Sequence, residues 1–143
     1  MTDALRPEFV EFIPSHLEEG VIYISTEYET AVHLCCSGCG EKVVTPLTPT
    51  GWRLTSKNGT VTLYPSIGNW SFACQSHYWI RNNRIEWARG MTQAQIEAGR
   101  RQEWIEQQAY FDKQPVQAVE DETEPRIGFW RRASAWLSRV VQR

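Results

Sequence analysis

Three cysteines and one histidine, arranged as two pairs with the same spacing, are the residues best suited to chemistry in this chain. Cys36 and Cys39 are separated by two residues, and Cys74 and His77 repeat this spacing further along the chain. Three thiolates and one imidazole complete the tetrahedral shell of a structural zinc ion. Gly38 permits the tight bend that brings the first two sulfurs to one ion. We therefore predict a single Zn²⁺ bound by Cys36, Cys39, Cys74 and His77.

The neighbouring Cys35 leaves the choice of ligand open. Cys35 can pair with Cys39 across a slightly longer turn, so it is the alternative to Cys36. A redox pair would explain only the first two cysteines. Cysteines buried as small hydrophobic residues, with a core histidine, are the purely structural alternative. A disulfide is disfavoured because nothing in the sequence indicates export.

Length and composition limit the classes of protein to which the chain can belong. Its 143 residues, 41% of them hydrophobic, suffice for one modest domain with appendages. The net charge of −2 argues against a general nucleic-acid binder. The N-terminal residues mix acidic and basic side chains with apolar ones, which is typical neither of a signal peptide nor of a spanning helix. We expect a cytoplasmic protein.

Strand-forming segments on both sides of the cysteine pairs predict a small, mainly β protein of the α+β class. Asn58-Gly59 favours a tight hairpin, and Asn82-Asn83 can also adopt the required positive backbone angles. We expect an antiparallel sheet resembling a zinc ribbon or a treble clef, with the two metal-binding pairs at strand ends. The expected strands are residues 21–25, 30–34, 43–45, 52–55, 60–64, 77–80 and 84–87.

The remaining third of the chain changes character twice. Thr92 and Gln95 have the spacing of a capping box, which predicts a helix over residues 92–111 that packs on a zinc-binding domain of residues 1–111. Residues 112–125 are acidic and almost free of apolar side chains, so we expect a linker. Residues 126–143 combine arginines with apolar residues at helical spacing. They predict a cationic amphipathic helix that docks on a membrane surface, in a partner's groove or on its own domain.

The predicted metal site argues against catalysis. Four Cys and His ligands close the zinc shell, whereas catalytic zinc keeps an open position for water. The sequence contains no H-E-x-x-H motif and no zinc-deaminase pattern. Ser66 and Ser76 have no evident catalytic partner, and Cys35 with His33 as its base is the remaining candidate nucleophile. We therefore assign no catalytic residue and favour a protein that is not an enzyme.

Several stretches resemble a bacterial family of small proteins of unknown function. They are His33 to Gly40, Val43 to Leu47, Tyr64 to Trp70 and Cys74 to Ile80. Members of that family are predicted to bind zinc. Their genes often lie beside genes for multi-ubiquitin-like proteins, ubiquitin-conjugating-type enzymes and ThiF-like activating enzymes. The family often has a cysteine where this chain has Ser37, and the additional Cys36 keeps the choice between Cys35 and Cys36 open.

The resemblance implies an accessory role in a bacterial ubiquitin-like conjugation pathway. The leading hypothesis is a zinc-stabilised adaptor, with a ligase-like factor as one form of it, that binds the modifier or the conjugating enzyme through Asn69, Trp70, Tyr78 and Trp79. The first alternative is a zinc- or cysteine-dependent enzyme that acts on a ubiquitin-like conjugate. The second is a nucleic-acid-binding zinc ribbon. The amphipathic segment of residues 126–143 would place the protein peripherally at a membrane if it docks there.

Overall fold

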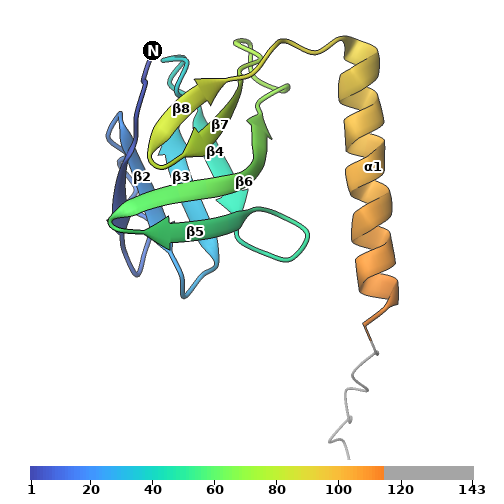
Figure 1. The fold of residues 1–143 in the computed structure, drawn as a ribbon, viewed down its shortest axis with the longest axis horizontal. Coiled ribbons are helices and arrows are strands. Elements are labelled where there is room, and N and C mark those ends of the chain that lie inside the picture. Colours follow the sequence, from blue (N-terminus) through green and yellow to red (C-terminus); the bar gives the residue numbers. More distant parts are fainter. Residues whose placement is uncertain (115–143) are drawn as a thin grey trace, which may run out of the picture. The chain divides into compact units, whose positions relative to one another are not determined.

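The computed structural model describes residues 1–114, which form two four-stranded sheets followed by one helix (Figure 1). The predicted cationic helix of residues 126–143 and nearly all of the predicted linker lie outside these residues. This architecture confirms the mainly β, α+β class. The elements are β1 (Arg6–Phe9), β2 (Val21–Ser25), β3 (Thr30–Leu34), β4 (Lys42–Pro46), β5 (Arg53–Lys57), β6 (Thr60–Gly68), β7 (His77–Arg81), β8 (Arg84–Trp87) and α1 (Gln93–Asp112).

The first sheet has the strand order β1-β2-β3-β4. β2 is buried along its whole length, as expected for a β-branched and aromatic segment in the middle of a sheet. β1 runs parallel to it, and β3 runs antiparallel with Tyr23 opposite Val32. β3 and β4 pair from Thr30 with Pro46 to Leu34 with Lys42. The chain that joins these two strands carries three of the four cysteines.

The second sheet has the strand order β5-β6-β7-β8 and contains both predicted hairpins. Asn58 and Gly59 have φ angles of 52° and 76°, and Asn82 and Asn83 have φ angles of 49° and 68°. These positive values confirm the turn chemistry expected from the sequence. Cys74 lies just before β7 and His77 is its first residue, so both lie where β7 begins.

β6 is longer than the sequence indicated. The expected strand ended at Tyr64, whereas β6 continues through Pro65 to Gly68. Pro65 cannot donate a ladder hydrogen bond. The pairing with β7 is irregular at this place, because its register shifts between Leu63 and Ile67. Such a bulge bends a strand and changes the direction of its side chains, and it is common beside functional sites.

The hydrophobic core combines residues of both sheets. Ile22 and Ile24 of β2 belong to the same buried cluster as Leu63 of β6 and Ile80 of β7. A strand with one face on the core and the other toward solvent alternates between buried and exposed residues, as β4 and β7 do. On β7, Tyr78 and Ile80 are buried whereas His77 and Trp79 are half-exposed. His77 and Trp79 therefore lie on the outer face of the second sheet.

Helix α1 begins with the predicted capping box. The Thr92 side chain accepts a hydrogen bond from the Gln95 backbone, and the Gln95 side chain accepts one from the Thr92 backbone. Ile96 is the buried residue of this helix, and Trp104 is 61% exposed. Among the described residues, no helix combines the length and the apolar character that crossing a membrane requires.

Candidate functional site

Three cysteine sulfurs meet between the chain that follows β3 and the chain that precedes β7. The Sγ atoms of Cys35, Cys39 and Cys74 lie within 4.8 Å of one another, and Cys35 and Cys74 are 3.8 Å apart. Two sulfurs at ~2.3 Å from the same tetrahedral ion are about 3.8 Å apart. This cluster therefore has the donor set and a sulfur spacing that fit a thiolate-binding metal ion.

The cluster differs in membership from the four predicted ligands. It contains Cys39 and Cys74 together with Cys35, which was named above as the alternative to Cys36. Cys36 lies in the turn after β3 and is fully buried, with its thiol against Tyr78, whereas the Cys35 sulfur lies against Cys74. Burial raises the pKa of the Cys36 thiol to about 12. His77 is not part of the cluster, and its ring contacts Ser66 instead.

Polar side chains surround the sulfur atoms. The Ser76 Oγ lies 3.1 Å from the Cys35 Sγ, and the Asn69 amide donates to that Ser76 oxygen at 2.9 Å. Partial burial raises the pKa of Cys74, but hydrogen bonds with Ser37 and Ser76 outweigh it and lower the value to about 6. A lowered thiol pKa favours the thiolate, which is the form that binds metal.

A serine and a histidine lie in contact on the outer face of the second sheet. Ser66 of β6 and His77 of β7 are diagonal neighbours, because Gly68 is paired with His77. The Ser66 Oγ is 2.9 Å from the His77 Nε2. This distance is that of a hydrogen bond between a hydroxyl and an imidazole nitrogen. Nucleophile and base are within the reach that nucleophilic catalysis requires.

The other imidazole nitrogen determines which way the proton lies. His77 Nδ1 is 3.4 Å from the backbone carbonyl oxygen of Arg89. A carbonyl oxygen can only accept a hydrogen bond, so Nδ1 carries the proton and Nε2 is free to accept the Ser66 hydroxyl hydrogen. This is the tautomer in which histidine acts as a general base toward serine.

The residues predicted to bind a partner divide between the interior and the surface. Tyr78 is fully buried, and its hydroxyl lies 2.7 Å from the His33 Nε2. Asn69 is 8% exposed and contacts the sulfur cluster. Trp70 and Trp79 are half-exposed on the same face as His77. Trp79 lies over the Tyr64 ring, with their centroids 6.0 Å apart.

The partner of Ser66 was not evident from the sequence. The spacing of Cys74 and His77 made the histidine a predicted zinc ligand, so it was not predicted to be a base. Two signals were available in the sequence: the second hairpin places His77 at the start of a strand, and strand alternation gives His77 and Trp79 the same exposed face. The missing information was the continuation of β6 past Pro65.

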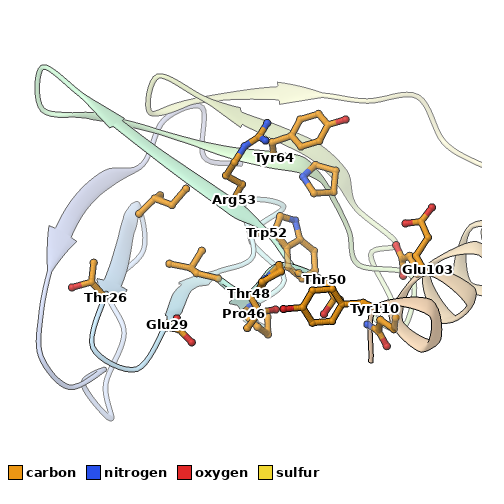
Figure 2. Close-up of a pocket in the computed structure, with 17 residues that line it drawn as sticks. Thr26, Glu29, Pro46, Thr48, Thr50, Trp52, Arg53, Tyr64, Glu103 and Tyr110 are labelled. Atoms are coloured by element: carbon orange, nitrogen blue, oxygen red, sulfur yellow. The ribbon is translucent and has the colours of Figure 1, made fainter. Parts of the chain in front are cut away.

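A cleft of about 1250 Å³ lies between the sheets' loops and α1, and neither Ser66 nor His77 is among its lining residues (Figure 2). Tyr64 and Pro65, the two residues before Ser66, line it. Figure 2 shows Trp52 and Arg53 at the cleft beside Tyr64, and Glu103 and Tyr110 of α1 also line it. The cleft thus reaches the strand segment that carries the serine.

Comparison with known proteins identifies the family. The chain matches no curated protein and no solved structure. A family model described as "Bacterial ubiquitination-like system serine protease (BubE)" matches residues 9–88, more than half of the chain.

Our preference for a protein that is not an enzyme is therefore wrong: the family is named for a protease. The error came from the metal assignment, which left no residue for catalysis. The resemblance to a family linked with bacterial ubiquitin-like conjugation is confirmed to that extent, because the chain belongs to the BubE family, which is assigned to a bacterial ubiquitination-like system.

Proposed function

We propose that the chain is a serine protease in which Ser66 is the nucleophile and His77 is the general base. The observation that carries this proposal is the 2.9 Å contact between Ser66 Oγ and His77 Nε2. The family description supports the reaction class. Cys35, the other candidate nucleophile, is 2% exposed, and the Nε2 of its neighbour His33 is held by Tyr78. Ser66 is half-buried and follows Tyr64 and Pro65, which line the cleft, so it is the better placed of the two.

The chemistry follows from the two hydrogen bonds of the imidazole. Ser66 Oγ attacks the carbonyl carbon of a peptide or isopeptide bond while its proton moves to His77 Nε2. The protonated imidazole then donates this proton to the leaving amine, and the acyl group remains on Ser66. Water, deprotonated by the same nitrogen, hydrolyses the acyl ester and restores the serine. The Arg89 carbonyl accepts the Nδ1 proton of the neutral ring, which keeps Nε2 free to take the serine proton.

The substrate we propose is a ubiquitin-like modifier or one of its conjugates in the bacterial pathway. The family's assignment to a ubiquitination-like system supports this class. The substrate segment that leads to the scissile bond would bind in the cleft that Tyr64 and Pro65 line. Its lining includes the aromatic residues Trp52 and Tyr64, which provide contact area at little conformational cost.

A fluorophosphonate probe tests the nucleophile without knowledge of the substrate, because it phosphonylates activated serines. We expect mass spectrometry to locate the label on Ser66. Ser66→Ala should abolish labelling, and His77→Gln should slow it by about 10²- to 10⁴-fold, the usual contribution of a general base. Ser71→Ala removes an exposed serine of a nearby loop and should label normally. Labelling that persists in Ser66→Ala would contradict the proposal.

We further propose that Cys35, Cys39 and Cys74 hold Zn²⁺. The support is their donor set and the 3.8 Å sulfur separation of Cys35 and Cys74. An ion here would tie the chain after β3 to the chain before β7, in which Cys74 stands three residues from His77. Its contribution would be to stabilise the loop from which the catalytic strand begins.

A further inference from the structure

We propose that Trp70 is a positioning residue for His77, and that it occupies a space that exists because residue 68 is glycine. This inference rests on the proposed function, since it concerns the base of the same dyad. Its evidence is separate from the contact between Ser66 and His77. The two observations that carry it are the space around Gly68 and the packing of the Trp70 ring against the imidazole.

Gly68 leaves room for the Trp70 indole on the outer face of the second sheet. A Cβ atom on residue 68 would lie 2.4 Å from the Trp70 Nε1 and 2.6 Å from its Cε2. These separations are far below van der Waals contact, and the rigid indole would have to move as a unit. The φ angle of Gly68 is not in the left-handed region, so the backbone conformation does not itself require glycine. Glycine is required here because a larger side chain would collide with the indole.

The indole that fills this space packs against the catalytic imidazole. The ring centroids of Trp70 and His77 are 5.0 Å apart, and their planes meet at 60° in an edge-on arrangement. This geometry is favoured for aromatic pairs because the positive edge of one ring meets the negative face of the other. Gly68 is also the residue paired with His77 across the strands. Strand pairing and ring packing therefore place Trp70 and His77 together.

His77 needs this contact because the hydrogen bond on its Nδ1 side is weak. Its bond to the Arg89 carbonyl is 3.4 Å long, and the acceptor is uncharged. The third member of a serine-protease triad is usually a carboxylate, which fixes the ring through a charged hydrogen bond. Among the described residues, the partners of the imidazole are Ser66, the Arg89 carbonyl and the Trp70 ring. The ring contact thus limits rotation that the long hydrogen bond would allow.

The arrangement also accounts for the order of residues in the segment from Pro65 to Trp70. Ser66 and Gly68 alternate along β6, so they share its outer face. Trp70 turns back over Gly68 from the loop that follows. One short segment therefore supplies the nucleophile, the space and the ring that contacts the base.

The rate at which a fluorophosphonate probe labels the full-length chain separates positioning from binding. We expect Trp70→Ala to lower the maximal labelling rate by about 10- to 100-fold, since small displacements of a catalytic group have effects of this size. The probe concentration that gives the half-maximal rate should change by less than about twofold, because the probe does not bind through Trp70. Trp70→Phe keeps an aromatic ring and should recover most of the rate. Trp104→Ala removes an exposed tryptophan of α1 and should label like the unmodified chain.

A double-mutant cycle tests the role of Gly68. Gly68→Ala should slow labelling because the new Cβ displaces the indole, and adding it to Trp70→Ala should cause little further loss because no ring remains to be displaced. Independent, multiplicative losses would overturn the inference, as would Trp70→Phe labelling as slowly as Trp70→Ala. Full-rate labelling of Trp70→Ala at Ser66 would refute the positioning role and leave the dyad intact. Absence of label on Ser66 in the unmodified chain would instead refute the proposed function, and this inference with it.

Discussion

His33 and Tyr78 show how single residues satisfy polar groups inside the protein. Both are fully buried, and the Tyr78 hydroxyl lies 2.7 Å from the His33 Nε2. Burial lowers the pKa of His33 to about 4, so the imidazole is neutral at physiological pH. Its Nδ1 has no hydrogen-bond partner among the described residues. The bond with Tyr78 is therefore the one that compensates for burying this histidine.

Tyr78→Phe should lower the free energy of unfolding by ~1–3 kcal/mol, because it leaves the buried Nε2 of His33 without its partner. Urea unfolding followed by fluorescence measures this change. Tyr64→Phe is the matched control, since the Tyr64 side chain is 55% exposed and surface changes of this kind stay within about 0.5 kcal/mol. Equal effects of the two substitutions would show that the buried bond contributes nothing.

At the scale of elements, local signals in the sequence predicted most of the second sheet. Asn58-Gly59 specified one hairpin and Asn82-Asn83 the other, because few residue pairs adopt positive φ angles at low cost. The sulfur cluster followed from spacing only in part, because the spacing selected Cys36 and His77, and neither belongs to the cluster. The choice of Cys35 over Cys36 did not, because it depends on the direction of each side chain where β3 ends. The dyad did not follow either, because it needs the irregular pairing of β6 with β7 beyond Leu63.

The sulfur cluster connects two loops, so its removal should affect both metal content and catalysis. We expect Cys39→Ala and Cys74→Ala to lose stoichiometric zinc, as measured by elemental analysis, and to label Ser66 more slowly because the chain before His77 loses its anchor. Cys36→Ala should keep its zinc, although it destabilises the core by removing a buried side chain. Zinc bound at full occupancy by Cys39→Ala would exclude the proposed ligand set.

At the scale of the whole molecule, the hydrophobic core of the described residues lies in the two sheets. Every residue of the core cluster lies between Leu5 and Ile85, which is nearly the region matched by the family model. Composition and strand patterning therefore predicted the class of fold well, since a core of this kind depends on alternation that is visible in the sequence. The contribution of α1 to the core could not be predicted from the sequence. The helix buries little more than Ile96.

A chain that ends at Lys113 should unfold cooperatively, with a free energy of unfolding within about 0.5 kcal/mol of the full chain, because residues 114–143 lie outside the compact unit that contains the core. Thermal and urea unfolding of the two chains provide the comparison. The truncated chain should also react with the fluorophosphonate probe at an unchanged rate. A broad, non-cooperative transition would show that the removed residues belong to the folded core.

The oxygen that orients His77 belongs to the main chain, and this has a consequence for how the proposed dyad tolerates substitution. Substituting the side chain at position 89 does not delete the carbonyl, so the tautomer is protected from the commonest kind of genetic variation. It depends instead on the path of the backbone between β8 and α1. The orientation of the proposed base is in this respect encoded in the path of the backbone rather than in the identity of an amino acid.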